Sequence, residues 1–334
     1  MTQATYDILG IGNAIVDVLA RTDDAFLSKH DMRKGSMALI DTATADAIYA
    51  AMPPGQETSG GSAANTCAVA AALGSSVAYI GKVADDQLGA VFRHDINAIG
   101  VHFPTAPLSA PLSGATPTAR CLILVTPDGQ RTMNTYLGAC VALSEADVDP
   151  ALVANAQVTY LEGYLFDPPA AQAAFRKAAA AAHAAGRRVA LSLSDAFCVN
   201  RHRAAFLDLV ANHIDILFAN EAEITALYER NTFEEAAEAA RKHVALAALT
   251  RSEAGSIILR GDETVHIAAE PTRVTDTTGA GDAYAAGFLA GLTANRPLDI
   301  CGRMGSIAAA EIISHYGARP ETDLRRLMAE KLGL

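Results

Sequence analysis

The chain has 334 residues, a formal net charge of −11 and a hydrophobic fraction of 51%. That length allows one large core with a small appended lobe, so we predict a single domain over residues 1–334. The negative charge argues against a nucleic-acid partner or an acidic membrane surface, and no apolar run reaches the roughly 18 residues of a membrane span. The N-terminus lacks the features of a signal peptide, and the five scattered cysteines include no CxxC pair, so we expect a cytoplasmic protein.

Short apolar runs alternate with helical patterns along the chain, which is typical of a layered α/β domain. The predicted strands cover residues 8–12, 77–83, 158–161, 189–193, 214–218, 246–250 and 256–259. The predicted helices cover residues 62–73, 87–99, 168–185, 233–243 and 298–315. Residues 18–54 and 118–136 interrupt the alternation, and the second segment contains the turn sequence TPDG at 126–129, which favours a β-hairpin. We predict that these two segments form a small sheet over the mouth of the larger domain.

The first glycine motif is GIGNAIVD at residues 10–17. It half-matches a dinucleotide fingerprint, but Ile15 stands in the place of the third glycine, so an NAD dehydrogenase is only an alternative. Asp17 follows a predicted strand, where an ionised carboxylate can accept hydrogen bonds from two vicinal hydroxyls. The alternative is a solvated loop acid.

A second glycine pair, at residues 60–61, opens the predicted helix that carries Asn65. Such a junction lets a ligand approach the backbone, although an ordinary helix start capped by Ser62 would have the same sequence. Arg131, on the outgoing arm of the hairpin, could reach over the site and neutralise a phosphate. The alternative is a solvated arginine on a strand. Asn220 and Glu223 follow a predicted strand and supply the oxygen atoms that suit Mg²⁺ with its waters, or else a helix cap with an exposed glutamate.

The segment DTTGAGD at residues 276–282 precedes an apolar, alanine-rich run that predicts a buried helix over residues 283–292. Its glycines leave backbone N–H groups accessible at a helix start, where the helix dipole favours an anion. Asp282 is placed to take a proton from a hydroxyl beside that anion, as phosphoryl transfer to an alcohol requires. The alternative is a glycine-rich turn with Asp282 as a helix cap.

These motifs, in this order, resemble those of the PfkB, or ribokinase-like, family of small-molecule kinases. The resemblance implies a three-layer α/β/α domain with a mostly parallel central sheet and a small β-sheet lid built from residues 18–54 and 118–136. It also implies ATP-dependent, Mg²⁺-requiring phosphorylation of a primary hydroxyl on a ribose-like substrate. Because the Gly-Asn-x-x-x-Asp sequence of residues 12–17 is most similar to that of adenosine kinases, adenosine is the first expected substrate.

The resemblance also implies a role for each matching residue. The catalytic group comprises Asp282 as base, the amides of Gly279, Ala280 and Gly281 as anion hole, and Arg131 over the phosphate. The substrate-binding residues are Asn13, Asp17, Met37, Leu39, Gly60, Gly61, Asn65, Tyr164 and Phe197. The ATP-binding residues are Asn220, Thr250, Arg251, Gly255 and Thr277, with Asn220 and Glu223 organising Mg²⁺ through water. A K⁺ ion at the loop that begins at Asp276 is a further expectation.

Two departures leave the substrate open. Tyr164 replaces the usual phenylalanine, and Asp195-Ala196 stands where Ala-Pro is usual in the adenosine enzymes. A kinase for ribose or a related sugar, and a catalytically silent nucleoside-binding protein, therefore remain alternatives. A competing account places Tyr164 and Phe197 in the core, and both a monomer and a homodimer are compatible with the sequence.

Overall fold

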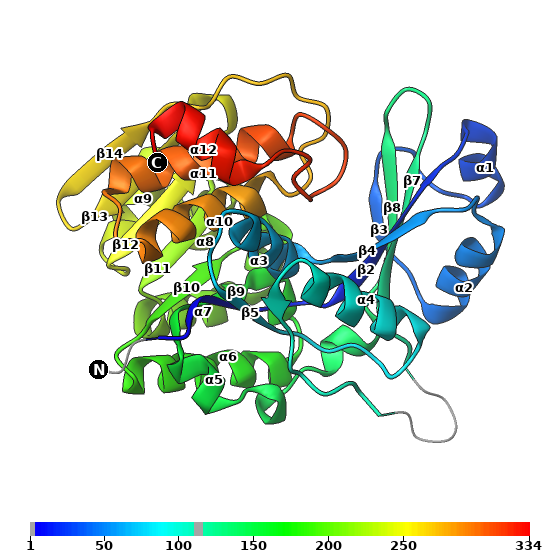
Figure 1. Cartoon of the computed structure of the whole chain (residues 1–334), viewed down its shortest axis with the longest axis horizontal. Coiled ribbons are helices and arrows are strands. Elements are labelled where there is room, and N and C mark those ends of the chain that lie inside the picture. Colours follow the sequence, from blue (N-terminus) through cyan, green and yellow to red (C-terminus); the bar gives the residue numbers. More distant parts are fainter. Residues whose placement is uncertain (1–3, 110–115) are drawn as a thin grey trace.

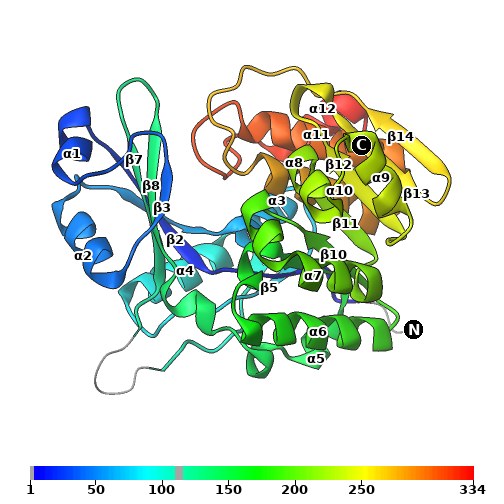
Figure 2. The same ribbon diagram turned by 180° about the vertical axis from the view of Figure 1, so that it is seen from behind.

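The computed structural model describes residues 4–109 and 116–334, which form a large sheet between helical layers and a smaller sheet to one side (Figures 1 and 2). The nine-stranded sheet has the order β14-β13-β12-β11-β10-β9-β1-β5-β6. Its strands are β1 (Tyr6–Ile11), β5 (Val77–Ile80), β6 (Val101–His102), β9 (Ala156–Glu162), β10 (Arg188–Ser192), β11 (Ile216–Asn220), β12 (Leu246–Thr250), β13 (Ser256–Arg260) and β14 (Glu263–Ile267). Neighbouring strands from β6 to β12 are parallel, whereas β13 and β14 are added antiparallel, so the predicted mostly parallel α/β sheet is confirmed.

Helices cover both faces of this sheet because its strands are apolar on both sides. In β1, Ile8 belongs to one buried cluster and Leu9 to the other, as the two-residue period of a strand requires. The first cluster contains residues of α3 (Ser62–Ala72), α4 (Gln87–Ala98), α10 (Ala280–Thr293), α11 (Leu298–Ile312) and α12 (Leu324–Leu332). The second contains residues of α5 (Pro150–Ala154), α6 (Pro169–Ala184), α7 (Ala196–His213), α8 (Glu221–Tyr228) and α9 (Phe233–Arg241). The chain thus has three layers, α/β/α.

The smaller sheet has the order β3-β8-β7-β2-β4 and stands beside the α/β/α layers (Figure 1). Its strands are β2 (Ile15–Arg21), β3 (Met37–Leu39), β4 (Gln56–Gly60), β7 (Ala119–Val125) and β8 (Arg131–Tyr136), and α1 (Asp24–Lys29) and α2 (Thr42–Ala51) complete this lobe. Both predicted segments contribute, but the sheet also includes β4, beyond residue 54. The predicted hairpin is present: β7 and β8 are antiparallel, and the Gly129 N–H donates to the Thr126 carbonyl at 2.8 Å with Gly129 at a φ of 82°.

The first glycine motif passes from one sheet to the other. After β1 the chain runs through Asn13 and Ala14 directly into β2, with no helix between the two strands. A dinucleotide site requires a helix N-terminus at this place, so the dehydrogenase alternative is wrong. Within the described residues, no helix is long and apolar enough to cross a membrane.

Candidate active site

Several of the predicted site residues, among them Asn13, Asn65 and Asp282, meet at the carboxyl ends of the central strands, where the smaller sheet joins the larger one. Glu162, the last residue of β9, accepts hydrogen bonds from Asn13 after β1 and from the Ala63 amide at the start of α3. Ser62 and Asn65 of α3 in turn contact Asp282 of α10. Ligands of open α/β sheets bind at this edge, and the motifs predicted from the sequence converge on it.

Asp282 lies in the first turn of α10 and is held by two side chains of α3. Its Oδ1 accepts from the Ser62 hydroxyl at 2.6 Å, and its Oδ2 accepts from the Asn65 amide nitrogen at 3.1 Å. Burial raises the pKa of the Asp282 carboxyl, while these hydrogen bonds and the Arg319 cation act in the opposite direction. A fixed carboxylate with a raised pKa is a better proton acceptor than a solvated one, which suits a general base.

The glycines before Asp282 shape the start of α10. Gly279 has a φ of 77°, a left-handed conformation that favours glycine, and it is the N-cap residue of the helix. The first N–H groups of a helix have no intrahelical partner, so this end can donate to an anion. Gly281 faces open space, because a Cβ built on it meets no neighbouring atom within 4 Å.

Replacing Gly281 by alanine tests whether the open space beside this residue is needed by a ligand rather than by the fold. The fold accommodates the added methyl group, so we expect an unchanged or slightly higher melting temperature, since alanine favours a helix over glycine. A phosphate against this backbone would be crowded, and we expect kcat/KM for ATP to fall by up to about 10²-fold, the scale of a misplacement of about 1 Å. Wild-type kinetics in Gly281→Ala would show that no phosphate approaches this residue.

The second glycine pair lets the end of β4 pack closely against Asp17 of β2 and against the Asn13 backbone. A Cβ on Gly60 would lie 2.3 Å from Asp17 Oδ2, and a Cβ on Gly61, at a φ of 98°, would lie 2.0 Å from the Asn13 carbonyl. Larger residues are therefore excluded at both positions. Burial raises the pKa of the Asp17 carboxyl to about 6, although the Arg319 and Arg131 cations lower it. Asp17 is not a solvated loop acid.

Glu162 is a buried acid that the sequence motifs did not identify. Its Oε1 accepts from the Asn13 amide nitrogen Nδ2 at 2.8 Å, and its Oε2 accepts from the Ala63 N–H at 2.7 Å. Burial raises the pKa of the Glu162 carboxyl to about 7, although these hydrogen bonds lower it. By fixing Asn13 and the start of α3, Glu162 supports the connection that leads into β2, the strand that carries Asp17. An acidic residue that ends an apolar strand, as in YLEG at 160–163, was the available signal.

Arg131 of β8 reaches from the smaller sheet to the loop before α10. Its Nη1 forms a salt bridge with Asp276 and donates to the Thr278 hydroxyl at 2.9 Å, and the side chains of the ion pair are more than nine-tenths buried. The solvated alternative for Arg131 is therefore wrong. Asp276 also accepts from the Gly317 N–H at 3.0 Å and from Thr278. Since this carboxylate already has these partners, a K⁺ ion on the loop would need backbone carbonyl groups as ligands.

Asn220 and Glu223 form a reciprocal cap at the start of α8. The Asn220 side chain accepts from the Glu223 N–H at 2.9 Å, and the Glu223 carboxylate accepts from the Asn220 N–H at 3.0 Å. Glu223 is buried, so the expected cap is present but the exposed glutamate is not. The pKa of the Glu223 carboxyl is raised to about 7, mainly by burial and also by the Asp195 and Asp282 carboxylates, although the hydrogen bond from the Asn220 backbone lowers it.

The described residues contain no group of three or more His, Cys, Asp or Glu side chains that could hold a metal ion. Proteins usually bind Mg²⁺ through one or two carboxylates together with water and phosphate oxygens. Glu223, an oxygen donor whose charged form is disfavoured by burial and by two like charges, is suited to a nearby cation.

The residues predicted for the ATP side lie along β11, β12 and the following turn. Asn220 and Thr250 are adjacent in the sheet register, and Gly255 turns the chain at a φ of 82°. Arg251 is committed to neighbouring elements: it pairs with Glu221 at 3.2 Å and Glu234 at 3.3 Å. Its guanidinium also lies 4.3 Å from the centre of the Phe233 ring. Thr277 is exposed in the loop before α10.

The predicted base-binding side chains are exposed. Phe197, near the start of α7, is 75% exposed and Tyr164 is 44% exposed, so the account that places both rings in the core is wrong. Met37 and Leu39 on β3 are also exposed, at the edge of the smaller sheet. Single exposed apolar side chains are normal on a protein surface, so exposure alone does not assign these residues to a ligand.

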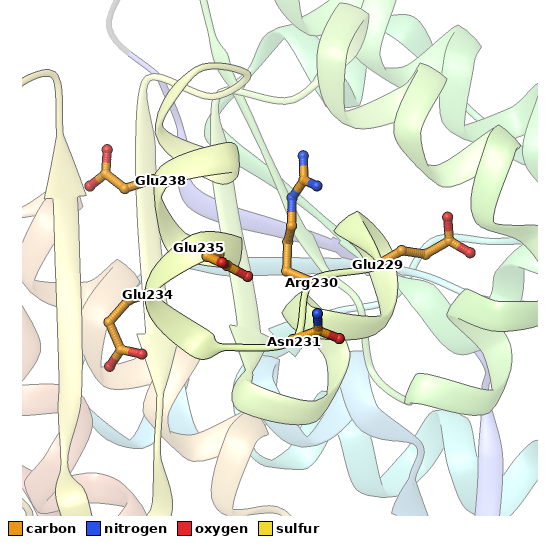
Figure 3. Close-up of a pocket in the computed structure, with 6 residues that line it drawn as sticks. All are labelled: Glu229, Arg230, Asn231, Glu234, Glu235 and Glu238. Carbon is orange, nitrogen blue, oxygen red and sulfur yellow. The ribbon is translucent and has the colours of Figure 1, made fainter.

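A surface pocket of about 600 Å³ lies elsewhere, at α8 and α9, and Figure 3 shows its mostly acidic lining. The lining residues are Glu229, Arg230, Asn231, Glu234, Glu235 and Glu238. None of the predicted site residues belongs to it.

Arg319, in the segment after α11, is the second residue that the sequence motifs missed. Its Nη1 donates to Asn65 Oδ1 at 2.9 Å, and its Nη2 donates to the Ser59 hydroxyl at 3.1 Å and to the Ser59 carbonyl. Burial lowers the pKa of the Arg319 guanidinium, although Asp17, Asp95 and Asp282 raise it. No motif of the sequence distinguishes this arginine from a surface one.

Comparisons with known proteins show the family of the chain. Residues 38–324 match the pfkB family of carbohydrate kinases. The adenosine kinase structure from Sinorhizobium meliloti is 52% identical, with a TM-score of 0.88 and coverage of 98% of this chain and 99% of that one. A probable sugar kinase from Rhizobium etli CFN 42 is 48% identical, with a TM-score of 0.89 and 99% of both chains covered. Adenosine kinase 1 of Arabidopsis thaliana is 24% identical over 352 residues, which cover 95% of this chain and 97% of the relative.

The family match spans most of the chain, and it agrees with the ribokinase-like fold and with the phosphoryl-transfer motifs. Family membership implies the use of ATP, generally with Mg²⁺. The chain belongs to the pfkB family of carbohydrate kinases and is a phosphotransferase with an alcohol as acceptor.

Proposed function

We propose that this enzyme transfers the γ-phosphoryl group of ATP to the 5′-hydroxyl of adenosine. The observation that carries the proposal is the placement of Asp282, a half-buried carboxylate held by Ser62 and Asn65 at a glycine-rich helix start. The exposed rings of Tyr164 and Phe197 and the adenosine kinase among the similar structures favour a nucleoside over a plain sugar.

In the proposed reaction, Asp17 accepts hydrogen bonds from the vicinal ribose hydroxyls and orients the 5′-hydroxyl toward Asp282. Asp282 takes the proton of that hydroxyl while the hydroxyl oxygen bonds to the γ-phosphorus. At the same time the bond between the γ-phosphorus and the β–γ bridging oxygen breaks, so that ADP leaves. The amides of Gly279, Ala280 and Gly281 donate to the oxygens of the transferred group. Bound Mg²⁺, near Glu223 and Asn220, would neutralise charge on the phosphates.

We also propose roles for Arg131 and the smaller sheet. The sheet formed largely by residues 18–54 and 118–136 covers the site as a lid, and closure excludes water from the phosphates. Its Arg131 is held by Asp276 and Thr278 beside the start of α10, a place from which its charge acts on the transferred group.

The test is an ADP-release assay across a panel of nucleosides and pentoses. We expect adenosine to be consumed with a higher kcat/KM than other nucleosides and ribose. Ready phosphorylation of ribose, with every nucleoside ignored, would replace adenosine by a sugar as substrate. If no acceptor of the panel supports ADP release, the nucleoside-binding alternative is favoured.

The proposed Mg²⁺ role of Glu223 gives a separate prediction. Glu223→Gln keeps the size of the side chain and an oxygen acceptor for the α8 cap but removes the charge. We expect the Mg²⁺ concentration for half-maximal ADP release to rise by about tenfold, the scale for losing a metal-orienting group. Glu235→Gln, the same substitution at an exposed glutamate in the first turn of α9, is the matched control. A lower affinity for adenosine with unaltered Mg²⁺ dependence would show that Glu223 acts on the nucleoside and that its proposed Mg²⁺ role is wrong.

A further inference from the structure

The proposed mechanism leaves one charged side chain of the site without a role. Arg319 lies in the segment between α11 and α12, yet it donates to Ser59 at the end of β4 and to Asn65 in α3. Ser59 is itself fixed from α4, because its N–H and its hydroxyl both donate to Asp95 Oδ2, at 2.7 and 2.5 Å. The guanidinium is thus held by a network that ends at Asn65.

The contact with Asn65 determines which end of that amide faces Asp282. An asparagine amide has one accepting oxygen and one donating nitrogen. Since Arg319 Nη1 donates to Asn65 Oδ1, the nitrogen is left to donate to Asp282 Oδ2. The reversed amide would place its oxygen against the carboxylate, where two acceptors repel each other.

The charge of Arg319 acts on the same carboxylate. Arg319 lowers the pKa of Asp282, whereas burial raises it. The other ionisable groups that interact with Asp282 are Asp17 of β2, Tyr160 and Glu162 of β9, Tyr164 after β9, and Glu223 of α8. Arg319 is therefore the cation that opposes a group of carboxylates around the proposed base.

We propose that Arg319 is a positioning residue, which orients the Asn65 amide toward Asp282 and keeps Asp282 ionised in its acidic surroundings. The inference rests on the proposed role of Asp282 as base. It assigns a catalytic consequence to a residue that does not contact the reacting atoms.

The test compares pH profiles of kcat/KM for Arg319→Met, Arg319→Lys and wild type, with ribose replacing adenosine if adenosine is not consumed. Loss of the cation favours protonated Asp282, so the acidic limb of the Met variant should move to higher pH. We expect its kcat/KM near pH 7 to fall by about tenfold, the scale of a small misplacement. Lysine restores the charge but cannot donate to Asn65 and Ser59 through two fixed nitrogen atoms. The Lys variant should therefore keep the acidic limb of the wild-type pH profile and have a reduced kcat.

Arg326→Met changes an exposed arginine of α12 and serves as the control, with wild-type kinetics expected. A wild-type limb and wild-type kcat in Arg319→Met, with only a lower melting temperature, would overturn the proposal. If the Met variant does not fold, wild-type kcat in Arg319→Lys overturns the hydrogen-bonding role in the same way. Asp282→Asn, assayed alongside, distinguishes the two hypotheses: if it stays active, the proposed base is wrong, whereas an inactive Asp282→Asn with unaltered Arg319 variants refutes only the role of Arg319.

Discussion

Replacing Asp282 by asparagine is expected to lower turnover by about 10² or more, the usual scale for losing a general base. Asparagine has the same shape, and its Oδ1 can still accept from the Ser62 hydroxyl, which lies 2.6 Å from the carboxylate, whereas its Nδ2 cannot accept the bond that Asn65 donates to Asp282 Oδ2. The variant should therefore fold and bind both substrates. Its amide has no affinity for a proton near neutral pH, so the 5′-hydroxyl would lose its acceptor.

The measurement is kcat for ADP release, with adenosine and ATP affinities determined by equilibrium binding. Asp299→Asn, in the first turn of α11 and exposed, is a matched substitution at a helix start for which we expect wild-type turnover. Near-wild-type turnover in Asp282→Asn would contradict the assignment of the base. A collapse of adenosine affinity with little change in kcat would make Asp282 a substrate ligand instead.

Much of the fold was predictable because burial on both faces of a parallel sheet produces short apolar strands. The predicted strand at 246–250 coincides with β12, and the glycine-rich helix starts at 62 and near 280 were located by their sequences. The helix α7 was not predicted. It contains a non-helical residue, His202, and only part of its surface is apolar, so its pattern is weak.

The site was predictable only where its residues belong to a local motif. Gly279, Gly281 and Asp282 are neighbours in the chain, so their spacing carries information about their shared helix start. Arg319 and Ser59 are 260 residues apart, and nothing in either segment refers to the other. Residues that act through long-range contacts, such as Arg319 on Asn65, become visible only when the fold brings them together.

The contrast between Asp282 and Phe197 concerns two different parts of the function. In the proposed mechanism the Asp282 carboxylate would serve any alcohol acceptor, whereas the exposed aromatic rings would bear on which acceptor is chosen. The similar proteins divide in the same way, since they include both a probable sugar kinase and an adenosine kinase. Substrate choice therefore has to be tested at the rings rather than at the base.

Phe197→Ala is expected to lower the affinity for adenosine by about ten- to a hundred-fold, because stacking of a base on an aromatic ring is worth roughly 1–3 kcal/mol. The Phe197 ring is 75% exposed, so it has a face available for a purine and contributes little to the core. The backbone at this position stays fixed, since the Phe197 N–H donates to the Asp195 side chain at 2.6 Å. Neither the KM for ATP nor activity toward ribose depends on the ring, so both should change little.

The ratio of kcat/KM for adenosine to that for ribose measures this effect directly, with melting temperature as the check on folding. Ile99→Ala, an exposed apolar residue at the end of α4, is the control and should leave the ratio unchanged. If Phe197→Ala also leaves the ratio unchanged, the purine does not stack on this ring, and Tyr164→Ala becomes the deciding variant. An unchanged ratio in both variants would remove the aromatic basis for adenosine specificity, while the phosphotransferase chemistry at Asp282 would stand.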